Sequence, residues 1–155
     1  YDTPPLVYAA SGCANMEINN LLIKNGADVA GCDRFGRTAL HYAAKDGPAE
    51  FIRLLIENKA PVNALEWNKS TPIHFASKNP NPEIFKILLD NGADINAQDA
   101  NGTAVINRLL VNTPEALECL EKWYSLFRSA QVSDLAEAII QAKAAANDAS
   151  AGASA

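Results

Sequence analysis

Hydrophobic positions along most of the chain recur in short blocks with the spacing of amphipathic helices. In the clearest block they fall at intervals of three and four, which places them on one broad helical face. The members of this block are Phe51, Ile52, Leu54, Leu55 and Ile56. A helix this short cannot hide such a face by itself, so the pattern predicts helices that pack against neighbours. We expect Leu54 and the later Leu88 to face that stack.

Polar and turn-forming residues divide the blocks into pairs of helices. Thr38 can act as the N-cap of a helix that runs through Lys45. Gly47-Pro48 then ends this helix and begins the next, because proline suits a first helical turn and cannot continue a helix. Lys59 stands where the equivalent helices end in a glycine with positive φ. Each unit is therefore predicted to be two short helices and a turn.

Two independent motifs recur with the same period. The run at 25–28, Asn-Gly-Ala-Asp, returns at 91–94, and a degenerate copy at 58–61 lies 33 residues from each. The run at 38–44 matches that at 71–77, again 33 residues later. An earlier copy begins at Pro5 and a worn later copy begins at Thr103. A period of this length indicates a repeat protein.

The best-preserved runs are Thr71-Pro72-Ile73-His74 and Gly92-Ala93-Asp94-Ile95-Asn96. In sequence and spacing they resemble the ankyrin repeat family. The resemblance covers residues 3–112, in units of about 3–32, 33–65, 66–98 and a degenerate 99–112. It implies an all-α fold, an ankyrin-repeat solenoid of helix-turn-helix units with β-hairpin-like fingers.

Lys69 departs from the family pattern at one finger. It replaces the glycine found at Gly36 and Gly102, so we expect this finger turn to be strained or to change shape.

The fourth unit departs further. Relative to Asp33 and Thr38, one residue is missing between Asp99 and Thr103, and Arg108-Leu109 takes the place of the small pair Ala43-Ala44. We expect this unit to end the array.

Beyond the repeats, Thr113-Pro114-Glu115 and Ser133-Asp134 have the composition of helix starts. They predict C-terminal capping helices over residues 113–146. Residues 147–155 consist of Ala, Ser, Gly, Asn and Asp, and we expect a low-complexity, disordered tail there.

Composition narrows the classes of partner and compartment. The net charge of −5 argues against binding to nucleic acid or to anionic membranes. No apolar run approaches the roughly 18 residues that a membrane-spanning helix needs. The odd number of cysteines, without a CxxC pair, favours a reducing, intracellular location, cytoplasmic or nuclear. The first residues show no secretory signal, and the missing initiating Met leads us to expect a fragment or processed product.

The candidate residues for chemistry favour no enzyme. His41 and His74 lie in equivalent places of neighbouring units, too far apart for one zinc ion, and the family resemblance implies that they hydrogen-bond backbone in the adjacent turn. Cys13 or Cys32 beside His41 could form a nucleophile and base, but no oxyanion motif accompanies them. We therefore predict no catalytic residue, no metal and no cofactor.

The resemblance implies that the protein binds a partner protein or peptide on its concave side. Finger tips and the exposed ends of the inner helices are the usual contact points in the family. The corresponding residues here are Arg34, Phe35, Arg37, Lys45, Asp46, Leu65, Trp67, Asn68, Ser70, Lys78, Asn79 and Gln98.

Two features of this strip suggest the kind of partner. Phe35 and Trp67 are of the aromatic type that dominates interface hot spots, although either could fold back onto a finger. The strip carries a net charge of +3 on a chain of net −5, which favours an acidic partner surface, and an ordinary solvated face is the alternative. An alternative function is a targeting or regulatory segment of a larger protein, for example a host-directed effector, whose activity lies elsewhere.

Overall fold

The computed structural model describes residues 3–12, 15–79, 81–105 and 108. The chain divides into two compact units, Tyr1–Val105 and Ile106–Ala155, and the second contributes only Arg108 to the described part. The predicted capping helices over 113–146 and the tail over 147–155 lie outside the described residues.

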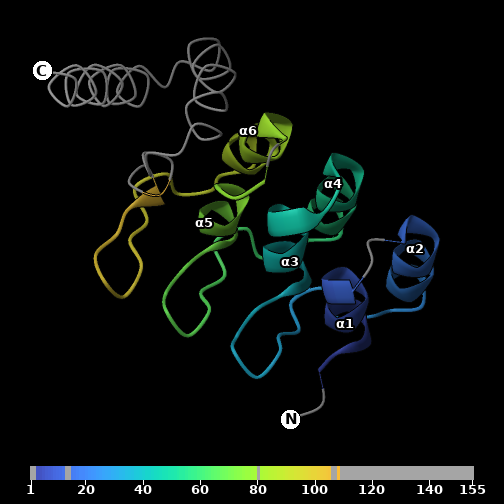
Figure 1. The fold of residues 1–155 in the computed structure, drawn as a ribbon. Helices are drawn as coiled ribbons and strands as arrows, with labels where there is room; N and C mark the ends of the chain where they lie inside the picture. The colour runs from blue at the N-terminus through green and yellow to red at the C-terminus, as the bar shows by residue number, and fades with distance from the viewer. Residues whose placement is uncertain (1–2, 13–14, 80, 106–107, 109–155) are drawn as a thin grey trace, which may run out of the picture. The chain divides into compact units, whose positions relative to one another are not determined.

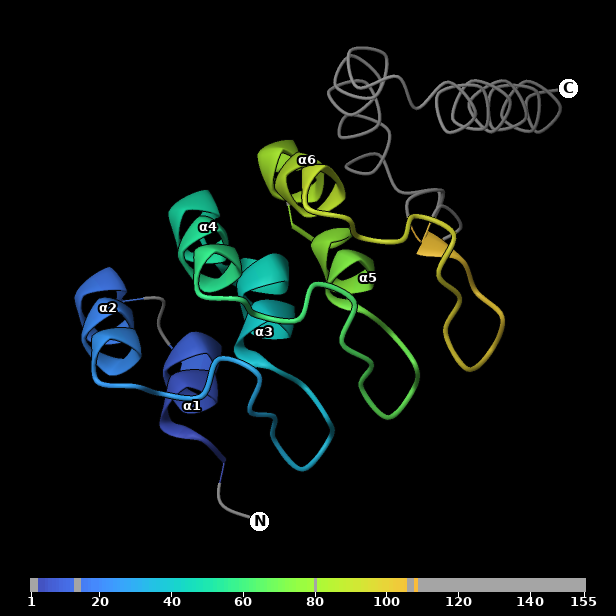
Figure 2. The same ribbon diagram turned by 180° about the vertical axis from the view of Figure 1, so that it is seen from behind.

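The described residues of the first unit form three consecutive pairs of short helices. They are α1 (Pro5–Gly12) with α2 (Met16–Lys24), α3 (Ala39–Asp46) with α4 (Ala49–Glu57), and α5 (Pro72–Ala76) with α6 (Pro82–Asp90). Figures 1 and 2 show α1, α3 and α5 side by side in an inner row, and α2, α4 and α6 in an outer row. Finger loops extend from the inner row, and none of the described helices is long and apolar enough to cross a membrane.

The fold is therefore the predicted all-α stack of helix pairs. The β character of the fingers is limited, within the described ranges, to isolated antiparallel bridges that join Cys32 to Thr38 and Gln98 to Ala104.

A threonine and a histidine begin each of the inner helices α3 and α5. The backbone N–H of Thr38 donates to Nδ1 of His41 at 3.1 Å, and Thr71 donates to His74 at the same distance. The two threonine hydroxyls lie 3.0 and 2.9 Å from the same ring nitrogens. A His side chain thus satisfies a backbone donor that the start of a helix leaves without an intrahelical partner.

Left-handed residues end the outer helices. Gly26, Lys59 and Gly92 have φ of 81°, 68° and 85°, respectively. This conformation reverses the chain so that the next N–H groups bond back to the last turn, for example Ala60 N–H to Leu55 O at 3.0 Å. Lys59 therefore ends α4 in the same way as the two glycines end their helices, as predicted.

The same conformation recurs at the finger turns. Lys69 has φ of 56°, close to the 78° of Gly36 and the 72° of Gly102. Its N–H donates to Glu66 O at 2.8 Å, as Gly36 N–H donates to Asp33 O at 3.0 Å. The finger keeps its shape, and the cost of the left-handed region falls on Lys69, at roughly 1–2 kcal/mol for a residue with a Cβ.

The prediction of a missing residue in the fourth unit is wrong. The bridge from Gln98 to Ala104 spans the same number of residues as that from Cys32 to Thr38. Ala104 therefore takes the place of Thr38, and Thr103 takes the place of Arg37. Thr38 and Thr103 share a residue type but not a position, because the backbone keeps the 33-residue register. In this register Arg108-Leu109 corresponds to Tyr42-Ala43 and not to Ala43-Ala44.

The hydrophobic core runs along the stack between the helix pairs. Leu40 and Ile73 of the inner helices are fully buried. The largest buried side chains of the outer helices are Phe51, Ile52, Leu55, Ile84, Phe85 and Leu88. Leu88 is thus in the core as predicted, but Leu54 is only half-buried, because the buried face of α4 is centred on its neighbours.

Asn19 is an exception in this core. It is fully buried on α2, at the place that Ile52 and Phe85 occupy in the next two units. Neither its Oδ1 nor its Nδ2 hydrogen-bonds to any described group. A buried amide without partners lowers the stability of the first unit.

We predict that Leu55→Ala lowers the free energy of unfolding by about 2–5 kcal/mol, because it leaves a cavity in the core. Leu54→Ala is the matched control on the same helix, with an expected cost of roughly 1 kcal/mol, since less apolar surface is lost. Urea unfolding followed by circular dichroism measures both. Equal costs would show that α4 packs through a different face.

We further predict that Asn19→Leu stabilises the protein by about 1–3 kcal/mol, because it removes an unpaired buried amide at nearly constant volume. The same urea titration measures the change. A midpoint that falls, or does not move, would mean that Asn19 gains a compensating interaction in solution.

Candidate binding face

Acidic side chains fix the conformation of the two best-described fingers. Asp33 Oδ1 accepts from the backbone N–H of Phe35 and Arg37 at 2.8 and 3.0 Å. One unit later, Glu66 Oε1 accepts from Asn68 and Ser70 at 2.9 and 3.2 Å. Each carboxylate thus accepts from backbone N–H groups that find no backbone acceptor in a tight turn. These bonds hold the tip residues in place.

Four side chains of these fingers form what we call the finger cluster: Arg34, Phe35, Arg37 and Trp67. The guanidinium carbons of Arg34 and Arg37 lie 4.6 and 5.0 Å from the centre of the Phe35 ring. The Trp67 ring meets that of Phe35 edge to face, with centroids 5.7 Å apart. These are distances at which cation–π and aromatic interactions are favourable.

The backbones of the two fingers also meet at this cluster. Trp67 N–H donates to Phe35 O at 2.9 Å. A Cβ on Gly36 would come within 3.2 Å of the Glu66 Cα and 3.4 Å of the Trp67 ring, so glycine allows the fingers to approach. Phe35 is half-buried as a result, whereas Trp67 remains 74% exposed.

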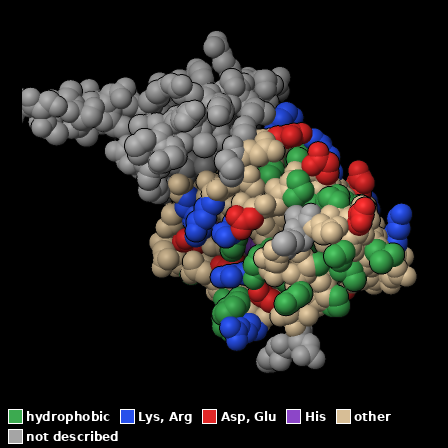
Figure 3. All heavy atoms as spheres, turned by 45° about the vertical axis from the view of Figure 1, so that its right-hand side comes forward, with side chains coloured by type: hydrophobic (Ala, Val, Ile, Leu, Met, Phe, Trp, Pro, Cys, Tyr) green, Lys and Arg blue, Asp and Glu red, His purple; other side chains and the backbone are tan. Residues whose placement is uncertain are grey.

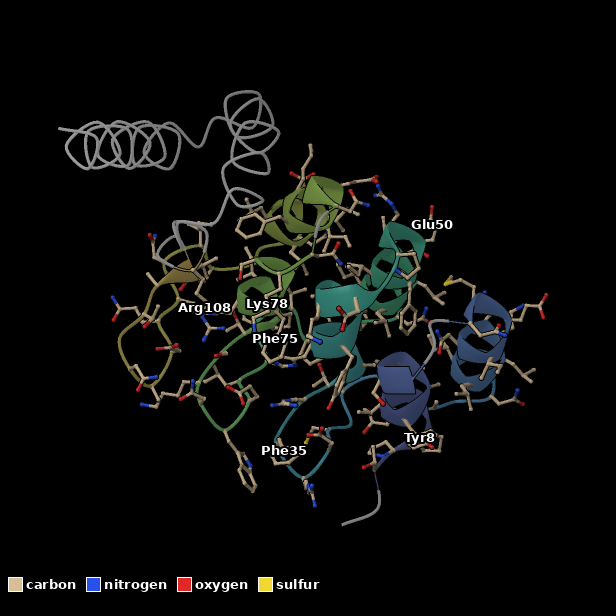
Figure 4. All side chains as sticks on the ribbon, in the orientation of Figure 1. Tyr8, Phe35, Glu50, Phe75, Lys78 and Arg108 are labelled. Atoms are coloured by element: carbon tan, nitrogen blue, oxygen red, sulfur yellow. The ribbon has the colours of Figure 1, made fainter. Side chains whose placement is uncertain are left out.

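The structure places most of the predicted contact residues at the surface. The exposed ones are Arg34, Asp46, Leu65, Trp67, Lys78 and Gln98, and the half-buried ones are Phe35, Arg37, Lys45 and Asn68. Figure 4 shows Phe35 on the finger ahead of α3, Phe75 and Lys78 at α5, and Glu50 on the outer helix α4.

Ser70 and Asn79 require a correction, because they are only 2% and 6% exposed. Ser70 lies at the base of its finger, where its backbone oxygen lies 3.2 Å from Nε2 of His41. The Asn79 amide donates to Ala44 O at 3.2 Å and accepts from Asn81 N–H at 2.9 Å. These two residues connect neighbouring parts of the fold, so we leave them out of the face.

Lys69 is an exposed cation of this face that the sequence analysis did not include. It lies next to the finger cluster, two residues from Trp67. In the sequence, Lys69 stands out only because it replaces a turn glycine, and that pattern does not indicate that its charge contributes to a binding face. Its equivalence to the turn glycines Gly36 and Gly102, which share its left-handed conformation, is the feature that indicates a position at the finger turn.

Charge differs between the two sides of the stack. The outer helices carry five carboxylates and three cations, namely Glu17, Glu50, Glu57, Glu83 and Asp90 with Lys24, Arg53 and Lys86. The fingers and the ends of the inner helices carry five cations and four carboxylates, namely Arg34, Arg37, Lys45, Lys69 and Lys78 with Asp33, Asp46, Glu66 and Asp99. The finger side is therefore the more positive one.

Asp33 stabilises the finger cluster through its hydrogen bonds to the backbone of Phe35 and Arg37. Burial raises the pKa of its carboxyl, but hydrogen bonds from the Tyr42 hydroxyl and from the backbone of Arg37 and Phe35 outweigh this and lower it below 3.8. The Tyr42 hydroxyl donates to Asp33 Oδ2 at 2.7 Å. The charged carboxylate is thus retained as an acceptor at neutral pH.

His41 performs the structural role that the family resemblance implied. Because its Nδ1 accepts the N–H of Thr38, the ring proton lies on Nε2, which donates to Ser70 O at 3.2 Å. Burial lowers the pKa of this ring below its ordinary value of 6.5. Among the described residues, no group of three or more His, Cys, Asp or Glu side chains could hold a metal ion.

We predict a loss of stability in mild acid that depends on His41. Its folded pKa is lowered, so its contribution is fully present above pH 6.5 and is lost as the pH falls through the folded pKa. The thermal midpoint of the protein should therefore drop between pH 7.5 and 5, and drop less in His41→Gln. An NMR titration in which the folded His41 ring protonates above pH 6.5 would contradict the assignment.

A protein-family model of ankyrin repeats matches residues 6–99 in three copies, a range that spans the three helix pairs. Comparison with curated proteins gives no significant match. The family match agrees with the stack of helix pairs, the fingers and the histidine caps described above. The chain belongs to the ankyrin repeat family.

Proposed function

We propose that this ankyrin domain binds a partner protein or peptide through its finger side, with Trp67 at the centre of the contact. Ankyrin repeat domains are generally protein–protein interaction modules. The observation that carries the proposal here is the exposure of Trp67, a large aromatic side chain held at a finger tip. Covering such a side chain is a strong source of binding energy.

The finger cluster lowers the entropic cost of that contact. Trp67 is held by the Phe35 ring, by its own N–H bond to Phe35 O, and by a finger whose turn Glu66 stabilises. A side chain that is already ordered loses less freedom on binding than a mobile one. Phe35 therefore acts as a support for Trp67, and Trp67 provides the exposed surface.

The charges of the finger side favour a partner with carboxylates. The guanidinium carbon of Arg34 lies 4.6 Å from the centre of the Phe35 ring, and the N–H donors of an exposed guanidinium match a planar carboxylate. Lys69 and Lys78 are exposed on the same side. The more acidic outer helices would repel the same partner, so electrostatics would both speed and orient its approach.

We predict that Trp67→Ala weakens partner binding by at least about 2 kcal/mol, roughly a thirtyfold rise in Kd. The partner is first captured with the wild-type domain, and affinities are then measured by calorimetry. Thermal unfolding of the same variant separates binding from folding. A midpoint that falls by several degrees with unchanged affinity would make Trp67 a structural residue only.

Charge reversal supplies a matched test of the proposed face. Arg34→Glu alters the finger side, and Lys24→Glu makes the same change in charge on the outer helix α2. The first should weaken binding and reduce the loss of affinity that added salt causes, whereas the second should leave both nearly unchanged. Equal effects of the two variants would indicate a general response to net charge and contradict the proposed face.

A further inference from the structure

Arg37 is a residue at which the repeat is broken. The equivalent positions, 33 residues before it and 33 and 66 residues after it, hold the uncharged residues Pro4, Ser70 and Thr103. Ser70 is buried at the base of its finger, whereas the longer Arg37 side chain is only half-buried. A long cation at this position therefore serves no role that the repeated fold requires.

The finger fixes the backbone of Arg37 and directs its side chain toward two aromatic rings. Its N–H donates to Asp33 Oδ1 at 3.0 Å, and its carbonyl oxygen accepts from Asp33 N–H at the same distance. Its guanidinium carbon lies 5.0 Å from the centre of the Phe35 ring and 5.8 Å from that of Phe75. Phe35 belongs to the finger and Phe75 to the inner helix α5, as Figure 4 shows. Arg37 thus connects the finger cluster to the inner helices.

The charge of Arg37 has no counterion in the part of the chain that the structure describes. None of the ion pairs found there includes it. The carboxylate of its own finger, Asp33, is engaged by the Tyr42 hydroxyl at 2.7 Å and by two backbone N–H groups. Arg37 interacts with the Tyr42 hydroxyl, but that group is neutral at physiological pH. Folding therefore removes part of the hydration of this cation without supplying an anion in its place.

The surroundings of the guanidinium favour a carboxylate as that anion. Its Nε is buried and has no hydrogen-bond partner among the described groups, so an anion must approach the terminal nitrogens. Two parallel N–H donors match the two oxygens of a carboxylate. A phosphate dianion would be repelled more strongly by the neighbouring Asp33. An ion pair at the half-buried Arg37 is also less weakened by solvent than one at the exposed Arg34.

The Phe35 ring brings Arg37 close to the exposed Trp67. The guanidinium carbon of Arg37 and the ring centroid of Trp67 lie 5.0 and 5.7 Å from the centre of that ring. In Figure 3, Lys and Arg side chains lie beside hydrophobic ones at the finger end of the molecule. Alternate side chains of an extended peptide share one face and lie about 7 Å apart. One short segment can therefore present a carboxylate and an apolar side chain to this surface together.

We propose that Arg37 determines the specificity of the finger side by binding an aspartate or glutamate side chain of an extended peptide segment. The same segment carries a large apolar side chain two residues away, which covers Trp67. This inference rests on the proposed function and adds the chemistry that the partner must have at a second point. Arg37 selects the charge, and Trp67 supplies the apolar contact.

Selection of random heptapeptides on the immobilised full chain tests this pattern without a known partner. The enriched peptides should carry Asp or Glu two residues from a Trp, Phe or Leu. The best of them is then compared, by fluorescence anisotropy, with a peptide in which Asn or Gln replaces only the acidic residue. This neutral peptide should bind at least about fivefold more weakly to the wild-type chain.

Variants of the protein assign this preference to a residue. In Arg37→Gln the acidic and neutral peptides should bind equally, because the counterion of the carboxylate is gone. Arg53→Gln is the matched control, since it removes a cation from the outer helix α4, and it should keep the full preference. Arg37→Lys keeps the charge and should retain part of it. The ratio of the two affinities within one variant does not depend on how much of that variant is folded.

The outcomes separate this inference from the proposed function. Peptides whose enrichment depends on Trp67, but whose acidic preference is absent or survives Arg37→Gln, would overturn the role of Arg37 alone. Equal weakening of both peptides by Arg37→Gln, with the preference retained and a lower thermal midpoint, would make Arg37 only a structural support. A phosphoserine peptide that binds more tightly than the acidic one would assign the site to phosphate and overturn the carboxylate. A selection that enriches no peptide would contradict both proposals.

Discussion

Burial between consecutive helix pairs is the interaction on which the rest of this structure depends. Each described helix has nine residues or fewer, which is too short to be stable in water by itself. Its stability comes from side chains such as Leu40, Phe51 and Leu88, which are fully buried only because another pair lies beside them. The histidine caps use the same contact, since the His41 ring begins one inner helix and also bonds to Ser70 of the next unit.

This dependence explains how a stack of weak elements can present a rigid surface. His41 connects α3 to the base of the following finger, and Trp67 N–H connects the tip of that finger to the preceding one. This finger is therefore held at its base and at its tip by the preceding unit. A disturbance of the stack should reach Trp67, so measurements of binding are interpretable only beside measurements of unfolding.

Sequence periodicity accounts for the helix pairs, the fingers and the histidine role, because a 33-residue repeat imposes one environment on each repeated position. Periodicity does not predict the burial of residues whose contacts are particular to one unit. Ser70 and Asn79 look like surface residues in sequence, but both are buried against the preceding unit, where Ser70 O bonds to the His41 ring and the Asn79 amide donates to Ala44 O. Leu54 belongs to an apolar run in which sequence alone does not define the centre of the buried face. Thr103 resembles Thr38 in residue type, but Ala104 takes the place of Thr38 in the backbone register.

Comparison of equivalent positions also distinguishes two kinds of exposed apolar residue, which cannot be told apart when each residue is considered alone. Trp67 is equivalent to Arg34 and Ala100, so no repeated core position explains a tryptophan there, and its exposure is particular to one finger. Ile18 is instead equivalent to Phe51 and Ile84, both of which are buried. The first pattern is what recognition of a specific partner requires, since a unique side chain distinguishes one finger from the next. The second pattern marks a position that serves stacking within the repeat. In a linear array, a contact with a partner is thus expected where the repeat is broken.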